Sequence, residues 1–178
     1  MEILQSKSLF FSKIRTIIKR NAEVNIATYN IFTGILDDGR YTNDWGGKFF
    51  NEVGALFDNL SLKDCHTHIK IGIPRPFKCQ LYEEIVESDV NNTFDASHCS
   101  SVSKSAKWDS RFEHIKTRWN RIKFSVVDNS HIKLILVSPN HYIIGGRNLS
   151  NSEDKDLSFY DTNQDMYNQL LNIFNKLE

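Results

Sequence analysis

The stretch "HIKLILVSPNHYIIGGRN", from His131 to Asn148, decides the fold. It contains two apolar, strand-like runs that are separated by Ser-Pro-Asn and followed by two glycines. Because side chains alternate along a strand, we expect His131 and Lys133 to project on the same side, with Leu134 and Leu136 buried around them. A strand that only builds a core has no need for either polar residue. The same stretch is therefore where we look for chemistry.

These residue types suit phosphoryl transfer. His131 can act as a nucleophile or as a general acid and base near neutral pH. Lys133 supplies a positive charge and hydrogen bonds for a phosphoryl oxygen. We expect Gly145 and Gly146 to form a tight turn whose backbone approaches a ligand, and Asn148 to offer an amide donor at the rim. Such a site requires no metal and no other cofactor, and no carboxylate cluster here suggests a metal.

The spacing of these residues resembles the motif of the phospholipase D superfamily. That motif reads H-x-K, four residues, Asp, six residues, then Gly-Ser or Gly-Gly, any residue and Asn. The chain has His131-Ile132-Lys133, four residues, Ser138, six residues and Gly145-Gly146-Arg147-Asn148. The resemblance is specific over residues 122–177 and extends over 24–73 as an order of strands and helices. Serine stands at the family's aspartate, so a member that has lost catalysis is one hypothesis.

The resemblance implies further residues and a mechanism. Family members orient the histidine with an acidic residue after the asparagine. Asp156 is best placed for that role, ahead of Asp154 and Glu153. The implied activity is a metal-independent phosphodiesterase, in which His131 attacks phosphorus and a second histidine protonates the leaving oxygen. Because the chain has one convincing motif, the second is expected from another copy in a two-fold homodimer.

A second H-x-K, His68-Ile69-Lys70, has no Gly-x-Asn after it. Pro74 and Pro76 follow instead. We interpret this tripeptide as part of a strand that carries polar residues without a catalytic role.

The pattern of the whole chain predicts one α/β domain over residues 1–178, with a phospholipase D-like mixed sheet flanked by helices. Residues 1–20 show the spacing of a basic amphipathic helix, either docked on the domain or lying on a membrane surface. A strand, a helix and a parallel strand are expected at 24–31, 48–60 and 67–73. Residues 78–107 are interpreted as a loop-rich insertion. The remaining elements are expected at 108–119 (helix), 122–127, 131–137, 141–146 and 157–160 (strands) and 164–177 (helix).

The closing helix is expected to bury one apolar face. Its members recur at helical spacing, and they are Met166, Leu170, Ile173, Phe174 and Leu177.

The distribution of charged residues indicates which class of partner the protein binds. Lys plus Arg and Asp plus Glu number 22 each, so no global field attracts nucleic acid. A local cluster that includes Arg111, Lys116 and Arg118, together with Arg147 and the two glycines of the motif, is the candidate surface for substrate phosphates. The alternative is that the cluster is simply the solvated face of a helix. Tyr41 and Trp45 are further candidates, either for stacking on a base or for packing.

Small single-motif members of the family are mostly nucleases, so the resemblance favours nucleic acid, with DNA ahead of RNA. A decayed binding module for nucleic acid or protein, and a phospholipid phosphodiesterase at a membrane, are the alternatives. The three cysteines are an odd number without CxxC spacing, so we expect neither a disulfide framework nor a zinc site, and a reducing compartment is the default. No apolar run approaches the ~20 residues of a membrane span, and we expect a cytoplasmic protein.

Overall fold

A computed structural model describes residues 1–29, 31, 52–72, 112–127, 130–149 and 156–178. The expected insertion at 78–107 lies outside the described residues, and so do Tyr41 and Trp45.

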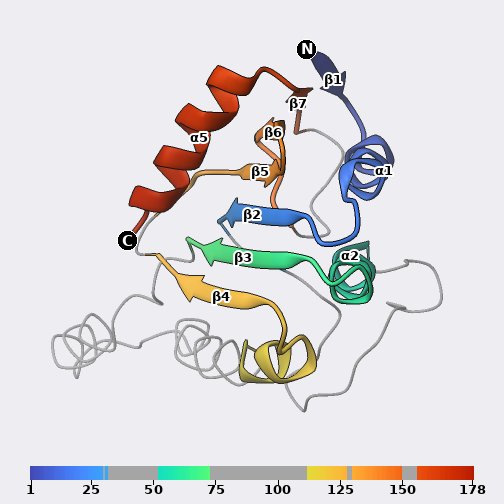
Figure 1. Cartoon of the computed structure of the whole chain (residues 1–178), viewed down its shortest axis with the longest axis vertical. Helices are drawn as coiled ribbons and strands as arrows, with labels where there is room; N and C mark the ends of the chain where they lie inside the picture. Colours follow the sequence, from blue (N-terminus) through green and yellow to red (C-terminus); the bar gives the residue numbers. More distant parts are fainter. Residues whose placement is uncertain (30, 32–51, 73–111, 128–129, 150–155) are drawn as a thin grey trace, which may run out of the picture.

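The described residues form a seven-stranded mixed sheet with the order β1-β7-β6-β5-β2-β3-β4 (Figure 1). Strands β2, β3 and β4 run parallel, whereas β1, β7, β6, β5 and β2 pair antiparallel to their neighbours. The predicted α/β class and the predicted parallel pair are confirmed. The strand bounds are β1 (Glu2–Leu4), β2 (Glu23–Thr28), β3 (His66–Ile71), β4 (Lys123–Val126), β5 (Leu134–Val137), β6 (His141–Gly145) and β7 (Ser158–Asp161).

Strand β5 differs from its prediction in a way that matters for function. It begins at Leu134, so His131 and Lys133 precede the strand instead of lying within it. Leu134 and Leu136 pack in the apolar cluster beneath α5 (Gln164–Lys176). The neighbouring Ile135 belongs to the cluster on the other face. The expectation that Leu134 and Leu136 surround the two polar residues is therefore wrong, because odd and even positions of this segment face opposite sides of the sheet.

Helices cover the two faces of the sheet unequally. Figure 1 shows α5 on one side and α1 (Lys7–Ile17) with α2 (Glu52–Leu62) on the other. A further helical turn at residues 112–118 leads into β4. None of the helices in these described ranges is long and apolar enough to cross a membrane.

Helix α1 is docked on the domain, as one of the two interpretations of residues 1–20 predicted. Its start is capped by Ser6, whose Oγ accepts a hydrogen bond from the Leu9 backbone N–H at 3.2 Å. The helix is shorter than expected because β1 occupies Glu2–Leu4 before it. Its buried side chains are Phe10, Phe11, Ile14 and Ile17. An interfacial helix needs those same apolar groups for lipid, and here they are in the core.

The buried face of α5 is rotated from the predicted one. Tyr167 and Phe174 are buried, whereas Met166 and Ile173 are exposed. Leu170 packs against the buried pair, as predicted. The helix begins at its Asn163 cap, whose side chain accepts the Met166 backbone N–H at 2.9 Å.

The second H-x-K anchors the end of α5. Lys70 Nζ donates to the backbone oxygens of Phe174 (2.9 Å) and Leu177 (2.6 Å). His68 Nε2 forms a 2.8 Å hydrogen bond with Ser125 Oγ, and its ring meets the Phe174 ring edge-on with centroids 5.4 Å apart. Both polar side chains therefore form hydrogen bonds within the fold, which agrees with the interpretation of this tripeptide as structural.

The anchor makes stability depend on pH. Burial lowers the pKa of His68 to about 4, and the charges of Lys123 and Lys70 act in the same direction. Because this lies below the value of 6.5 for an unburied histidine, the neutral ring stabilises the fold. That contribution is complete above pH 6.5 and is lost as the pH falls from 6.5 to 4.

We expect the free energy of unfolding, measured by urea titration, to decline as the pH is lowered from 6.5 to 4. The matched control is His68→Asn, because an amide can bond Ser125 but does not titrate. Its decline across the same window should be smaller. Equal declines in the two proteins would show that His68 is not responsible.

Candidate active site

Three polar side chains meet beyond the carboxyl end of β2. Tyr29 follows the last residue of β2, and its ring stacks on the His131 ring with centroids 4.2 Å apart and an interplanar angle of 17°. Lys133 Nζ lies 5.7 Å from the centre of the same tyrosine ring. The pairing of β5 with β2 produces this arrangement, because Leu134 lies opposite Ala27 and the residues just outside that pair must also be neighbours.

Asn148 joins the group through the backbone of the same tyrosine. Its Oδ1 accepts hydrogen bonds from the Tyr29 backbone N–H at 3.0 Å and from Thr28 Oγ1 at 3.4 Å. The Leu149 backbone N–H donates to Thr28 Oγ1 at 3.1 Å, and Leu149 forms a β-bridge with Ile31. A backbone N–H can only donate, so the amide oxygen must face it. The Asn148 NH₂ group is then left as a donor.

The site carries donors without matching acceptors. His131 is exposed and Lys133 is half-buried. Within the described residues, neither side chain has a hydrogen bond or an ion pair to another group, and Asn148 Nδ2 has none either. A cation and N–H donors that converge without a carboxylate suit an anion with several oxygens. His131, Lys133 and Asn148, the polar residues of the sequence motif, thus all lie next to Tyr29.

Sequence reasoning missed Tyr29 and Thr28. Both lie within the strand predicted at 24–31, whereas β2 ends at Thr28, and neither belongs to the motif. The available signal was positional, because the ends of parallel strands are where α/β sheets hold ligands. Sequence alone did not show that β5 pairs with β2, and without that pairing Tyr29 has no link to His131.

Ser138, at the position of the family's aspartate, lies at the other end of β5. Its Oγ accepts a hydrogen bond from the Glu23 backbone N–H at 2.9 Å. Its own backbone N–H donates to the Glu23 oxygen, also at 2.9 Å. The serine therefore ties the end of β5 to the start of β2, a whole strand length away from His131.

Gly145 is required by the chain itself, whereas a Cβ at Gly146 would make only ordinary contacts. Gly145 pairs with Ser158 of β7, and a Cβ at Gly145 would stand 2.4 Å from the Leu157 backbone oxygen. A Cβ at Gly146 would stand 3.4 Å from the Asp156 side chain, and the Gly146 N–H donates to the Leu157 oxygen at 3.0 Å. The close approach that we expected toward a ligand is thus made toward β7.

Asp156 and Arg147 lie differently from the expectation. The Asp156 carboxylate lies beside Gly146, and none of the described hydrogen bonds joins it to His131. Arg147 is only 3% exposed. Its Nη2 donates to the backbone oxygens of Gln5 (3.3 Å) and Asp156 (2.5 Å), which ties the β1–α1 connection to the start of β7. Arg147 is therefore placed inside the protein and away from the surface at which we expected it to meet a substrate. Asp154 and Glu153 lie outside the described residues.

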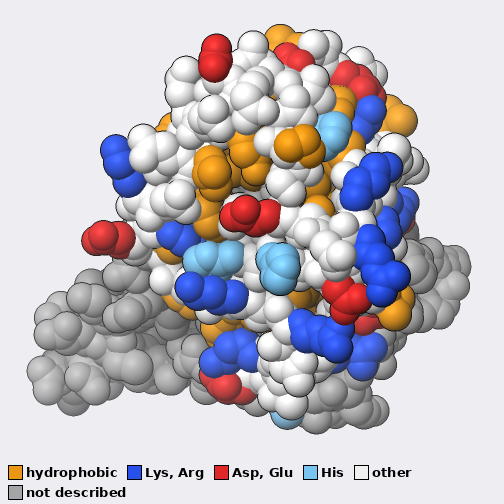
Figure 2. Space-filling view, viewed as in Figure 1, with side chains coloured by type: hydrophobic (Ala, Val, Ile, Leu, Met, Phe, Trp, Pro, Cys, Tyr) orange, Lys and Arg blue, Asp and Glu red, His pale blue; other side chains and the backbone are white. Residues whose placement is uncertain are grey.

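Of the expected basic cluster, Arg111 lies outside the described residues. Lys116 pairs with Glu113 and lies 5.0 Å from the centre of the Phe112 ring. Arg118 approaches Asp58 Oδ1 at 3.8 Å. Figure 2 shows lysine and arginine side chains on one face of the molecule with carboxylates interspersed among them.

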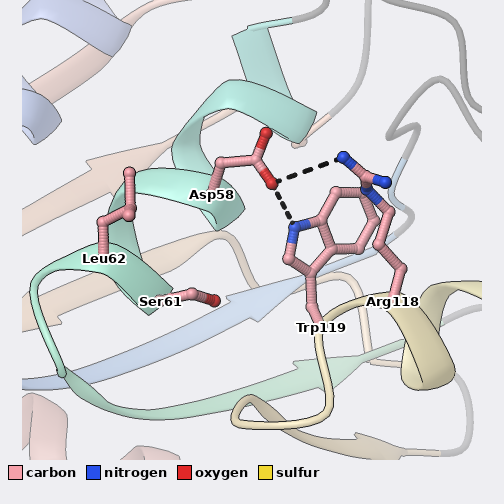
Figure 3. Close-up of a pocket in the computed structure, with 5 residues that line it drawn as sticks. All are labelled: Asp58, Ser61, Leu62, Arg118 and Trp119. Atoms are coloured by element: carbon pink, nitrogen blue, oxygen red, sulfur yellow. Dashed lines mark hydrogen bonds and ion pairs between the residues drawn. The ribbon is translucent and has the colours of Figure 1, made fainter.

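Arg118 lines a hollow of about 470 Å³ whose other residues are Asp58, Ser61, Leu62 and Trp119 (Figure 3). Asp58 also accepts a 2.8 Å hydrogen bond from Trp119 Nε1. The hollow lies where α2 ends and just before β4 begins, at the amino end of the parallel strands. His131 and Asn148 lie beyond the carboxyl end, so the structure does not bring Arg118 to them.

The role of Asn148 in holding the site can be measured as stability. Asn148→Ala removes the acceptor of the Tyr29 N–H and the Thr28 hydroxyl, which we expect to cost about 1–3 kcal/mol of unfolding free energy. Asn148→Asp retains an acceptor oxygen and should lose less. Urea denaturation at neutral pH measures both. An alanine variant as stable as the wild type would show that these hydrogen bonds do not hold the two segments together.

No protein-family model and no curated protein sequence matches the chain. Among solved structures, the phospholipase D family member Nuc from Salmonella typhimurium matches with a TM-score of 0.52 at 12% identity, over 99% of this chain and 91% of that one. NucT from Helicobacter pylori matches with a TM-score of 0.50 at 11% identity, over 96% of this chain and 85% of that one.

A polyphosphate kinase from Porphyromonas gingivalis matches with a TM-score of 0.51 at 10% identity. This match covers 94% of the chain but 23% of the kinase. Identities this low establish a shared fold. The structure and these likenesses together confirm that the chain has the phospholipase D-like fold.

Proposed function

We propose that the protein is a metal-independent phosphodiesterase, and specifically an endonuclease that cleaves phosphodiester bonds of nucleic acid. The observation that carries the proposal is the convergence of His131, Lys133 and Asn148 beyond β2 as donors without acceptors. Their spacing resembles the phospholipase D motif, and the fold is the one shared with Nuc. Fold and site chemistry thus support the same class of reaction.

The proposed reaction has two displacements at phosphorus. In the first, a His131 ring nitrogen forms a bond to phosphorus, and the bond to the leaving oxygen breaks. That oxygen takes a proton from a second His131. In the second displacement, the His131 of the other copy removes a proton from water, the water oxygen attacks phosphorus, and the phosphorus–nitrogen bond breaks. Lys133 and the Asn148 amide stabilise the charge on the phosphoryl oxygens in both transition states.

The second histidine is proposed to come from another copy of the chain. The other H-x-K is unsuited to this part, because Lys70 is bonded to two backbone oxygens and His68 is bonded to Ser125. His131 is exposed, as a site shared with a second copy requires. A two-fold axis through the site would place the two copies of His131 across one phosphate.

Nucleic acid, with DNA ahead of RNA, is the proposed substrate because the resemblance is to small single-motif members. The phospholipid alternative loses support from α1, whose apolar residues are in the core. A decayed module was suggested by Ser138, but this residue contacts Glu23 and lies away from the donors. Arg111 and Lys116 are retained as candidate contacts to substrate phosphates.

Cleavage without metal tests the activity. The protein is incubated in EDTA with plasmid, single-stranded DNA and RNA, beside His131→Ala and Lys133→Met. We expect cleavage by the wild type and a loss of at least about 100-fold in each variant. His66→Ala is the matched control, because His66 is an exposed histidine at the start of β3. No cleavage of any polymer by a folded wild type, or equal cleavage by His131→Ala, would overturn the proposal.

Mixing tests the shared site. If both copies of His131 are needed, a dimer with one His131→Ala subunit is inactive. After random exchange of subunits at equal amounts, roughly a quarter of the activity of the undiluted wild type should remain, and not a half. The measurement is the cleavage rate against the fraction of wild-type subunits, with the dimer followed by light scattering. A linear dependence would indicate that each chain works alone.

A further inference from the structure

Tyr29 occupies a position that the motif does not describe. It contacts both ends of the motif. Its ring stacks on His131, and its backbone N–H is held by Asn148 Oδ1. Lys133 approaches the same ring to 5.7 Å. All three motif residues therefore have a contact with Tyr29.

The His131 ring needs such a support. A histidine that attacks an electrophile must hold its ring plane in one orientation, and a hydrogen bond to a carboxylate usually fixes that orientation. Here none of the described hydrogen bonds joins Asp156 or any other acceptor to His131. The near-parallel stack at 4.2 Å and 17° is the contact that restricts rotation of the exposed ring.

We propose that Tyr29 is the positioning residue of the site, holding the His131 ring by stacking while its backbone holds Asn148. The inference rests on the proposed function for its catalytic consequence, but the stack itself is a property of the folded chain. The two contacts use different parts of the residue. The ring can therefore be removed while the backbone hydrogen bond to Asn148 is kept.

Three variants of Tyr29 separate the role of its aromatic ring from the role of its backbone N–H. Tyr29→Leu removes the aromatic ring and keeps apolar bulk and the backbone N–H. Tyr29→Phe keeps the ring, and Tyr29→Met is a second non-aromatic variant in case the leucine variant does not fold. The matched control is Tyr160→Leu, because Tyr160 stacks on His141 with the same interplanar angle of 17°, outside the site. Circular dichroism confirms that each variant is folded.

The first measurement is the NMR spectrum of the histidine ring protons, with the His131 signals identified by their absence in His131→Ala. Stacking places these protons over an aromatic ring, so we expect upfield shifts in the wild type and in Tyr29→Phe. Tyr29→Leu should move them toward the positions of a free histidine. Unchanged His131 signals in both non-aromatic variants would overturn the inference, and the measurement requires no turnover.

The second measurement is steady-state cleavage. We expect kcat to fall about tenfold in Tyr29→Leu with KM little changed, because the ring orients the nucleophile and does not bind the substrate. Tyr29→Phe should restore most of the loss, and Tyr160→Leu should leave kcat unchanged. A loss confined to KM, or no loss at all, would also overturn the inference. A wild type without cleavage would defeat the proposed function alone, and the ring-proton shifts would then decide the role of Tyr29.

Discussion

The antiparallel pairing of β5 with β2 is the constraint on which the site depends. Its register places Ala27 opposite Leu134 and Val24 opposite Val137. This register buries Leu134 and Leu136 under α5, and a slip by one residue would turn them to the other face. The apolar core thus fixes the register, and the register fixes which residue meets His131 beyond the end of the strands. The geometry of the candidate site is in this sense a consequence of core packing.

Strand β2 is also the boundary between the two halves of the sheet. On one side it pairs parallel with β3, and on the other it pairs antiparallel with β5. The pairing of the sheet therefore changes from parallel to antiparallel at β2. Open α/β sheets hold ligands outside the carboxyl ends of their parallel strands. The convergence of His131, Lys133 and Asn148 at this place agrees with that general rule.

The sequence predicted the elements better than their edges. Helix α2 and strand β3 follow from periodicity, because each buries one clear apolar face. Strand β1 was missed since Ile3 and Leu4 also fit the helical spacing of α1. In α5, Leu170 belongs to two overlapping apolar stripes, and only packing against β5 and β6 decides that Tyr167 is buried and Met166 is not. Pairwise context of this kind is not present in a local pattern.

The residues of the candidate site were likewise predicted only in part from the sequence. Motif spacing identified the three converging residues, because their spacing is local. Arg147 was placed at the surface since its partners are the backbone of Gln5, far away in sequence, and of Asp156. Tyr29 was missed for the same reason, as its contact with His131 arises only after β2 and β5 have paired. Long-range contacts thus account for the errors, and local spacing for the successes.

The two H-x-K tripeptides show why spacing alone does not assign function. In His68-x-Lys70 the ammonium bonds two backbone oxygens at the end of α5 and the imidazole bonds Ser125. Burial there keeps the imidazole neutral, since it lowers the pKa of His68 to about 4. In His131-x-Lys133 the described residues offer neither group an acceptor, and the ring rests on a tyrosine. A lysine whose N–H donors are already bonded within the protein stabilises the fold. A lysine with unused donors at the end of a strand is available to bind an anion. The second pair is therefore the better candidate for an anion site, because its strand begins only after both residues.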